Sequence, residues 1–304
     1  MKKSLATSLF TLLVISLMIF ASEFTGEKEI IFPEVAALCA GAFLAPRLVW
    51  KTTYFKMILC ISICAILGVL IVIFMPFPLW IQFSLAFALG QIVLFCSRTS
   101  FAPMISAISL PVLIQTRSLV YIVAAFSLTV LIVALGVILE KMNLREKNQN
   151  ERVSVFFKEF APAFFFRTIL IILSAFLCIR FGVKFCVAPP LLVAFTELTN
   201  KNSPAAKRIF SVILLVSFCA LLGAATRFFL TMKFALPLTL SAFFATVGII
   251  ALIKAFRLPF PPAAAMCVLA FLISESEVVR YPIEVLAGIS VMSVSAWVWN
   301  KIRA

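Results

Sequence analysis

Long apolar runs separated by short polar breaks make up most of the chain, and polar residues do not alternate with apolar ones inside the runs. Such runs predict membrane helices rather than a barrel, because a helix satisfies its own backbone hydrogen bonds in lipid. Twelve segments are predicted, at about residues 4–22, 31–45, 54–75, 79–97, 101–115, 118–139, 162–181, 186–199, 208–230, 234–253, 259–274 and 280–299. The second, fifth, eighth and eleventh hold roughly 15 residues, fewer than the about 20 that cross a bilayer core. We expect these four as re-entrant or broken helices, with full spans as the alternative.

The two halves of the chain share a pattern of prolines and glycines. Pro33 and Pro103 in the first half recur as Pro189 and Pro261 in the second. The other matches are Pro46 with Pro204, Gly68 with Gly223 and Gly90 with Gly248, and all offsets fall between 155 and 158 residues. A duplicated six-segment unit is therefore predicted. The expected domains are a first membrane repeat at 1–140, a charged linker at 141–159 and a second membrane repeat at 160–304.

Lys and Arg residues in the breaks predict the orientation. With the N-terminus inside, the inner loops and termini carry 18 of them and the outer loops seven. Because cytoplasmic loops are enriched in Lys and Arg, both termini and the linker are predicted to be cytoplasmic and the two repeats parallel. The first apolar run could also be a signal peptide, but its counterpart at 162–181 lies in mid-chain, so it is predicted to stay as a span. We expect a protein integral to the cytoplasmic (plasma) membrane.

Composition agrees with this class. The 304 residues are 64% hydrophobic and 12% charged, and the mean hydropathy is +1.18, which leaves too little polar surface for a soluble globule. The predicted fold is all-α, a polytopic bundle of transmembrane helices. The net charge of +14 follows from the enrichment of cytoplasmic loops in Lys and Arg, so no nucleic-acid partner is expected. The expected partners are membrane lipids and a small anion or organic acid, and a homo-oligomer is left open.

Several chemistries are excluded by the residues that the chain lacks. It has no His and no Asp, which rules out a Ser-His-Asp triad, a Cys-His pair and a histidine metal site. It also has no glycine-rich phosphate loop. The eight cysteines lie in apolar segments without a Cys-x-x-Cys spacing and are interpreted as packing residues. We expect no enzyme activity, no cofactor and no metal.

Prolines stand at the start of each short segment. Proline is tolerated best in the first turn of a helix, where its missing N–H would have no partner. The short segments enter from opposite sides, so their helix N-termini are expected to meet near the midplane and to form an anion site from backbone N–H groups. The alternative is that the prolines only set short turns between ordinary spans. The substrate-binding candidates are Pro33, Glu34, Pro103, Ser106, Pro189, Pro190, Pro261, Pro262, Arg98 and Arg257.

Two glutamates at membrane depth are further candidates, because ionisable residues there are costly and suggest function by default. Glu34 is expected to cap its helix or to compete with an anion for the site. Glu197 is the candidate for proton coupling, with an interfacial salt bridge to Lys201 or Arg208 as the alternative.

The arginines divide by position. Arg98 and Arg257 precede two of the proline-headed segments and are expected to attract an anion from the cytoplasmic side. Arg280 and Glu284 are spaced i, i+4 and are interpreted as a structural pair. Arg227 lies near a helix end, where its long side chain is expected to extend to the interface.

The second half resembles a known family. Ala188-Pro189-Pro190, Ser203-Pro204, Gly223 and Leu258-Pro259-Phe260-Pro261-Pro262 follow the layout of the HPP integral membrane family over about residues 165–300. That family is named for a His-Pro-Pro motif that opens a transmembrane helix, and Phe260 stands in place of the histidine here. The resemblance implies transport of a small anion such as nitrite. The same layout also resembles the membrane units of fusaric acid or aromatic acid exporters, which implies export of aromatic carboxylates.

We therefore expect a secondary transporter or facilitator of a small anion or organic acid. An exporter of aromatic carboxylates is the first alternative. A non-transporting membrane subunit or scaffold, whose linker binds a partner, is the second.

Overall fold

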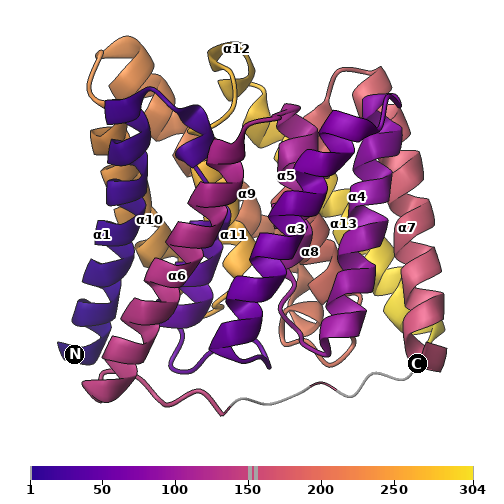
Figure 1. Ribbon diagram of the computed structural model, residues 1–304, viewed down its shortest axis with the longest axis horizontal. Helices are drawn as coiled ribbons and strands as arrows, with labels where there is room; N and C mark the ends of the chain where they lie inside the picture. Colours follow the sequence, from indigo (N-terminus) through magenta and orange to yellow (C-terminus); the bar gives the residue numbers. More distant parts are fainter. Residues whose placement is uncertain (1, 150–152, 154–156, 304) are drawn as a thin grey trace.

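The computed structural model describes residues 2–149, 153 and 157–303. The chain is 78% helix, and no strand occurs in the described part. Eight helices are long and apolar enough to span a membrane (Figure 1). They are α1 (Lys2–Thr25), α3 (Tyr54–Phe74), α4 (Leu79–Ser97), α6 (Leu119–Lys141), α7 (Phe157–Arg180), α9 (Ile209–Thr226, extended by η5 at Arg227–Lys233), α10 (Leu238–Phe256) and α13 (Tyr281–Ile302). This is the helical architecture of an integral membrane protein.

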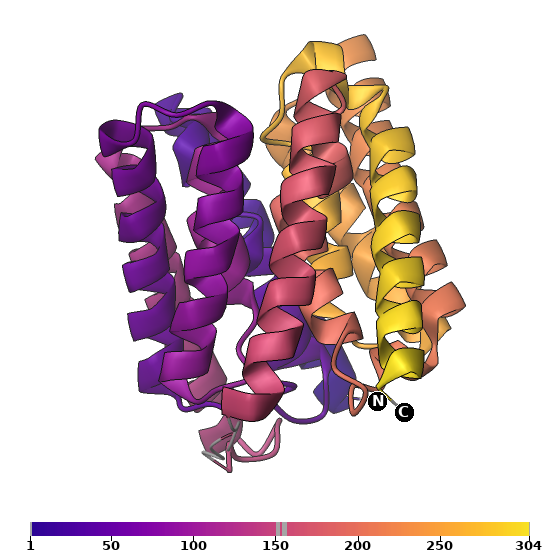
Figure 2. The ribbon, with the colours of Figure 1, turned by 90° about the vertical axis from the view of Figure 1, so that its right-hand side faces the viewer.

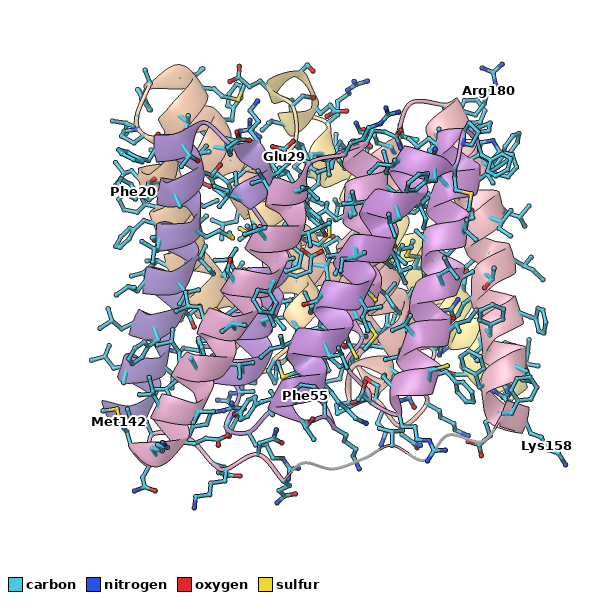
Figure 3. All side chains as sticks on the ribbon, viewed as in Figure 1. Phe20, Glu29, Phe55, Met142, Lys158 and Arg180 are labelled. Carbon is cyan, nitrogen blue, oxygen red and sulfur yellow. The ribbon has the colours of Figure 1, made fainter. Side chains whose placement is uncertain are left out.

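Side chains on the outside of the bundle suit a lipid environment. Figure 3 shows apolar side chains such as Phe20 projecting from the long helices, and Phe20 and Phe55 are 52% and 73% exposed. Charged side chains such as Lys158 and Arg180 lie at opposite ends of the bundle. We refer below to the Lys158 end and the Arg180 end. Apolar sides with charged ends fit the hydrocarbon and headgroup layers of a bilayer.

Four further helices are short and buried inside the bundle. They are α2 (Glu34–Cys39), α5 (Pro103–Ile114), α8 (Pro189–Leu198) and α11 (Pro261–Leu269), and they occupy the second, fifth, eighth and eleventh predicted segments. The longest has 12 residues, or about 18 Å at 1.5 Å per residue, and is too short to cross about 30 Å of hydrocarbon. The long helices surround them and keep them from lipid.

Short elements complete the connections. At the Arg180 end, η1 (Lys28–Ile30) precedes α2, η3 (Lys184–Val187) precedes α8, and α12 (Glu275–Val278) follows α11. On the other side, η2 (Ala40–Leu44) prolongs α2 and η4 (Ala205–Lys207) follows α8. The predicted linker at 141–159 overlaps the start of α7, and residues 150–152 and 154–156 of it lie outside the described residues.

The two halves of the chain lie side by side (Figure 2), and the first helix of each half packs against the other half. In the first half α1 packs against α10, and in the second half α7 packs against α4. Among the short helices α2 contacts α11, and α5 contacts α8. Neither half is therefore a complete helix bundle by itself, because each contributes one helix to the packing of the other.

Two glycines allow a long helix to touch the backbone of a short one. A Cβ on Gly68 of α3 would lie 2.4 Å from the carbonyl oxygen of Ile108 in α5, and one on Gly223 of α9 would lie 2.1 Å from that of Cys267 in α11. A side chain at either place would push the short helix away. The match between Gly68 and Gly223 in the sequence thus corresponds to the same kind of contact in both halves.

Two buried tyrosines also make matching bonds. The hydroxyl of Tyr121 in α6 donates to the carbonyl of Ala107 in α5 at 2.8 Å, and that of Tyr281 in α13 donates to Met266 in α11 at 2.5 Å. Both tyrosines are fully buried. Each bond anchors a short helix to the last long helix of its own half.

Candidate functional site

The four short helices meet at one small cavity in the middle of the bundle. Each contributes one residue of its first turn and the residue three positions later, which lie on the same face of a helix. The lining residues are Glu34 and Ala37 of α2, Pro103 and Ser106 of α5, Pro190 and Val193 of α8, and Pro262 and Ala265 of α11. The cavity measures about 10 Å³, about the space that one water molecule needs.

Local sequence explains why the first turns point inward. Phe260, directly before α11, has extended backbone (φ −111°, ψ 94°), and Ala188 before α8 is also non-helical. The prolines that follow hold φ near −65° and start the helix without needing an N–H acceptor. Small residues such as Ala265, three positions later, let the four helices approach closely.

Glu34 is the charged residue at this cavity. It opens α2 and is 1% exposed. Ser106 of α5 donates a hydrogen bond to its Oε1, whereas its Oε2 has no hydrogen-bond partner among the described residues. The Ser106 hydroxyl is not a cation, and no Lys or Arg pairs with Glu34 among the described residues. Within that part of the chain one carboxylate oxygen is therefore bonded and the other is left unsatisfied.

Backbone donors at the cavity are fewer than the sequence led us to expect. Pro189 and Pro190 open α8 and Pro261 and Pro262 open α11, and none of these has an N–H. The next N–H of α8, from Leu191, donates to the preceding turn at 2.8 Å. The partial positive charge of each helix start remains, but α8 and α11 offer no ready cradle of N–H groups for an anion.

The remaining proline candidates lie beside the lining residues. Pro33 precedes Glu34 as the residue before α2, and Pro189 and Pro261 are the first residues of α8 and α11. In α8 and α11, therefore, the first proline of the pair starts the helix and the second lines the cavity.

The two arginine candidates do not reach the cavity. Arg98 and Arg257 end α4 and α10 in the left-handed backbone region, with φ of 50° and 49°. The carbonyl of Arg98 accepts a bond from Val153 in the linker, and that of Arg257 accepts one from Arg208. Both arginines therefore lie toward the Lys158 end, where they close helix ends.

Glu197 also lies away from the cavity, near the C-terminal end of α8. The indole of Trp50, in the connection between η2 and α3, lies near its carboxylate, but the Trp50 Nε1, in a residue that is 4% exposed, has no hydrogen-bond partner among the described residues. Among the described residues Glu197 forms no ion pair with Lys201 or Arg208. Arg208 donates instead to the carbonyls at the end of α10.

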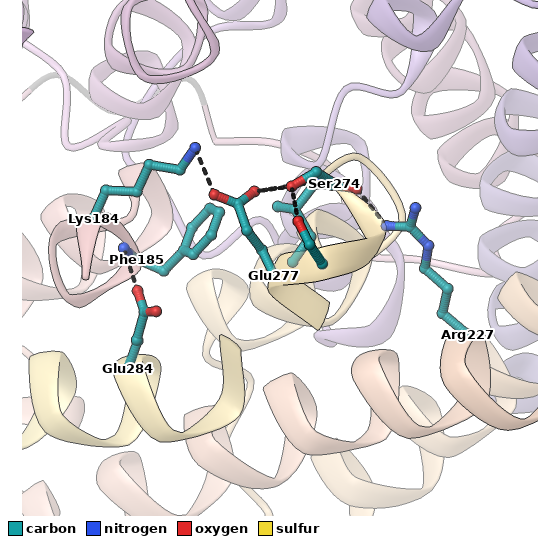
Figure 4. A network of polar contacts seen from close by, with 8 residues as sticks. Lys184, Phe185, Arg227, Ser274, Glu277 and Glu284 are labelled. Carbon is teal, nitrogen blue, oxygen red and sulfur yellow. Dashed lines mark hydrogen bonds and ion pairs between the residues drawn. The ribbon is translucent and has the colours of Figure 1, made fainter. Parts of the chain in front are cut away.

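A larger pocket at the Arg180 end was not anticipated from the sequence. It measures about 230 Å³ and lies between the ends of α5 and α11 and the η3 turn. Its lining residues are Leu113, Ile114, Lys184, Phe185, Leu272, Ile273, Ser274 and Glu277. Lys184 and Glu277 form an ion pair at 2.8 Å across it (Figure 4). The Ser-x-x-Glu spacing of 274–277, a capping box in the structure, is the sequence signal that would have located this turn.

The ion pair at this pocket changes the titration of Glu277. Burial alone would raise the pKa of its carboxyl, but the hydrogen bonds and charge of Lys184 and the bond from Ser274 hold that pKa below its ordinary value. A carboxyl whose pKa is lower in the folded state stabilises the fold above its unfolded-state pKa, and this stability is lost as the pH falls through the folded-state value.

Glu277→Gln is therefore expected to lower the melting temperature at neutral pH and to have little effect in acid. The two side chains are 34% and 23% exposed, so the loss is expected to be about 1 kcal/mol or less. The measurement compares the melting temperatures of the wild type and the variant in detergent at pH 7 and at about pH 2, where the carboxyl is protonated in the folded and the unfolded state. A difference of equal size at both pH values would contradict the assignment.

The structure corrects two expectations about charged residues nearby. Glu284 is not ion-paired with Arg280 among the described residues; its Oε2 accepts a bond from the Phe185 N–H at 2.9 Å instead. Arg227 is not at the interface, since it is 6% exposed and donates to the carbonyls of Ala270 and Ile273, both at 2.6 Å (Figure 4). Both residues stabilise turns that surround the pocket.

No known protein family, curated protein or solved structure matches the chain. The resemblance to the HPP family and to aromatic acid exporters thus stays a prediction. Within the described residues no group of three His, Cys, Asp or Glu side chains is placed to hold a metal ion.

Proposed function

We propose that the chain is a secondary transporter or facilitator of a small anion or organic acid, and that its substrate passes where α2, α5, α8 and α11 meet. The observation that carries the proposal is the cavity lined by the first turns of all four short helices. Broken helices that meet at membrane depth are the usual construction of a transporter's binding site. Since the cavity holds about one water molecule, transport requires that the four first turns move apart.

The proposal includes two parallel six-segment repeats, at residues 1–140 and 160–304. It is supported by the matching tyrosine and glycine contacts and by the reciprocal packing of α1 on α10 and α7 on α4. Two such units can rock against each other and open the central cavity to one side at a time. The excess of Lys and Arg at one end supports a plasma-membrane protein with both termini in the cytoplasm.

An anionic substrate is supported by the charges along the path. The starts of α5, α8 and α11 carry partial positive charge toward the cavity. Arg98 and Arg257 lie toward the Lys158 end, whereas Lys184 at the other end is ion-paired with Glu277. An anion entering from the Lys158 end therefore meets positive charge.

One observation favours the aromatic carboxylate alternative. The pocket of about 230 Å³ at the Arg180 end combines the apolar side chains of Phe185 and Leu113 with the ammonium group of Lys184. An apolar body with one carboxylate would match this lining where that carboxylate takes the place of Glu277 as the ion-pair partner of Lys184.

The experiment is flux into liposomes that contain the purified protein. Nitrate, nitrite and benzoate are supplied in turn, with and without a pH gradient, and protein-free liposomes correct for passive entry. Saturable uptake that needs the protein is expected for at least one of these anions. Absence of protein-dependent flux across the whole panel would reject transport and favour the scaffold alternative.

A further inference from the structure

Glu34 is a buried carboxyl group at the cavity where the four short helices meet. Its Oε2 has no partner among the described residues, and the residue lines the cavity opposite the first turns of α8 and α11. An ionised carboxylate that is buried without a cation costs several kcal/mol, whereas the neutral acid costs much less. The position therefore favours uptake of a proton.

The groups that surround Glu34 leave it without a counter-ion. Tyr121 on α6 is a titratable group close enough for the Glu34 charge to act on it, but it is neutral, and its hydroxyl donates to a backbone carbonyl of α5. Cys267 is the titratable residue on α11, and Cys39 is the other one on α2. The buried stretches of α1 and α5 that contact α2 carry no titratable side chain.

Two effects on Glu34 oppose each other. The starts of α5, α8 and α11 and the Ser106 hydrogen bond favour the ionised form. Burial without a cation favours the neutral form. Because these two effects oppose each other, water that enters the cavity from one side would stabilise the ionised carboxylate and shift Glu34 from its neutral to its ionised form.

We propose that Glu34 is the proton-binding site of the transport cycle, an inference that rests on the proposed function. The carboxylate takes up one proton at Oε2 and becomes a neutral carboxylic acid, and it later releases the same proton to the opposite side. No other bond changes. Because an ionised Glu34 repels an anion and a neutral one does not, anion and proton cross together. A monovalent anion then moves without net charge.

The test uses nitrate, whose acid is too strong to cross the bilayer in its neutral form, and a pH-sensitive dye inside the liposomes. In the wild type an inward nitrate gradient should acidify the interior. Glu34→Gln, which cannot take up the proton, should lose this acidification more than tenfold while nitrate exchange stays detectable. Glu29→Gln, a carboxyl on the η1 turn outside the cavity, is the matched control and should keep the acidification.

Two further variants make the outcome decisive. Ser106→Ala retains Glu34 but removes the bond that stabilises its ionised form, so half-maximal coupled flux should move to higher pH. Glu197→Gln tests the competing carboxylate. Acidification that persists in Glu34→Gln, or that is lost in Glu197→Gln alone, would overturn the role of Glu34 while leaving transport in place. Wild-type protein that moves none of the anions would reject the transport proposal itself, and this inference with it.

Discussion

Ala265→Leu is expected to reduce anion flux by a factor of ten or more without unfolding the protein. Ala265 lines the central cavity, and a leucine there adds three carbon atoms to a space of about 10 Å³. Inserting methylenes into a packed site costs about 1–3 kcal/mol, and each 1.4 kcal/mol is a factor of ten in a rate or equilibrium. The wider side chain would occupy the cavity through which the proposed transport path runs. Flux into liposomes, normalised to reconstituted protein, measures the effect.

A second substitution distinguishes a blocked path from a damaged fold. Val193 lines the same cavity from α8, so Val193→Ala removes two carbon atoms from it. The double variant Ala265→Leu with Val193→Ala is expected to regain part of the flux. A double variant that is no faster than Ala265→Leu, although both elute as folded protein and unfold cooperatively on heating, would contradict a path through this cavity.

Arg227→Met is expected to lower the melting temperature by roughly 5 °C or more. The Arg227 guanidinium bonds the carbonyls of Ala270 and Ile273 at the end of α11, both at 2.6 Å. Hydrogen bonds to charged groups contribute about 1.5–3 kcal/mol, and buried carbonyls left without a donor lose a similar amount. One kcal/mol corresponds to about 2–4 °C for a chain of this size class. Thermal unfolding in detergent, followed by circular dichroism, measures the loss.

The control for Arg227 is an arginine outside the network. Arg180 ends α7 and is exposed, so Arg180→Met is expected to shift the melting temperature by little. Arg227→Lys keeps the charge but cannot reproduce the geometry of the guanidinium, and is expected to fall between the wild type and Arg227→Met. Equal melting temperatures for Arg227→Met and Arg180→Met would show that the carbonyls at the end of α11 find other donors.

Part of the architecture followed from the sequence because it depends on local chemistry. Apolar length distinguishes the eight long helices from the four short ones, since the hydrocarbon core sets a minimum length for a span. Proline marks the starts of α5, α8 and α11 because it suits a first turn and is disfavoured in helix interiors, although Pro111 and Pro162 lie inside α5 and α7. Gly68 and Gly223, which match in the sequence, both lie against the backbone of a short helix. Gly90 and Gly248 also match in the sequence, but Gly90 contacts α5 whereas Gly248 contacts Leu222 of α9.

The candidate site followed from the sequence only in outline. Glu34, Pro103, Ser106, Pro190 and Pro262 all line the cavity. The sequence could not distinguish Pro262 from Pro261, because one position along a helix turns a side chain by about 100°, and only packing decides which face is inward. Nor could it show that consecutive prolines deprive α8 and α11 of the N–H donors expected at an anion site.

By itself, the sequence determined the class of protein, the places where helices begin and the four that stay short, because each depends on hydrophobicity and backbone chemistry within a few residues. The tertiary structure alone decided that α1 and α7 exchange halves, that Arg227 turns inward to the end of α11, and that Lys184 reaches Glu277. It also decided that Glu34 is left with one unsatisfied oxygen. These features depend on contacts between residues far apart in the chain, and such contacts are set by how whole helices rotate and pack against one another.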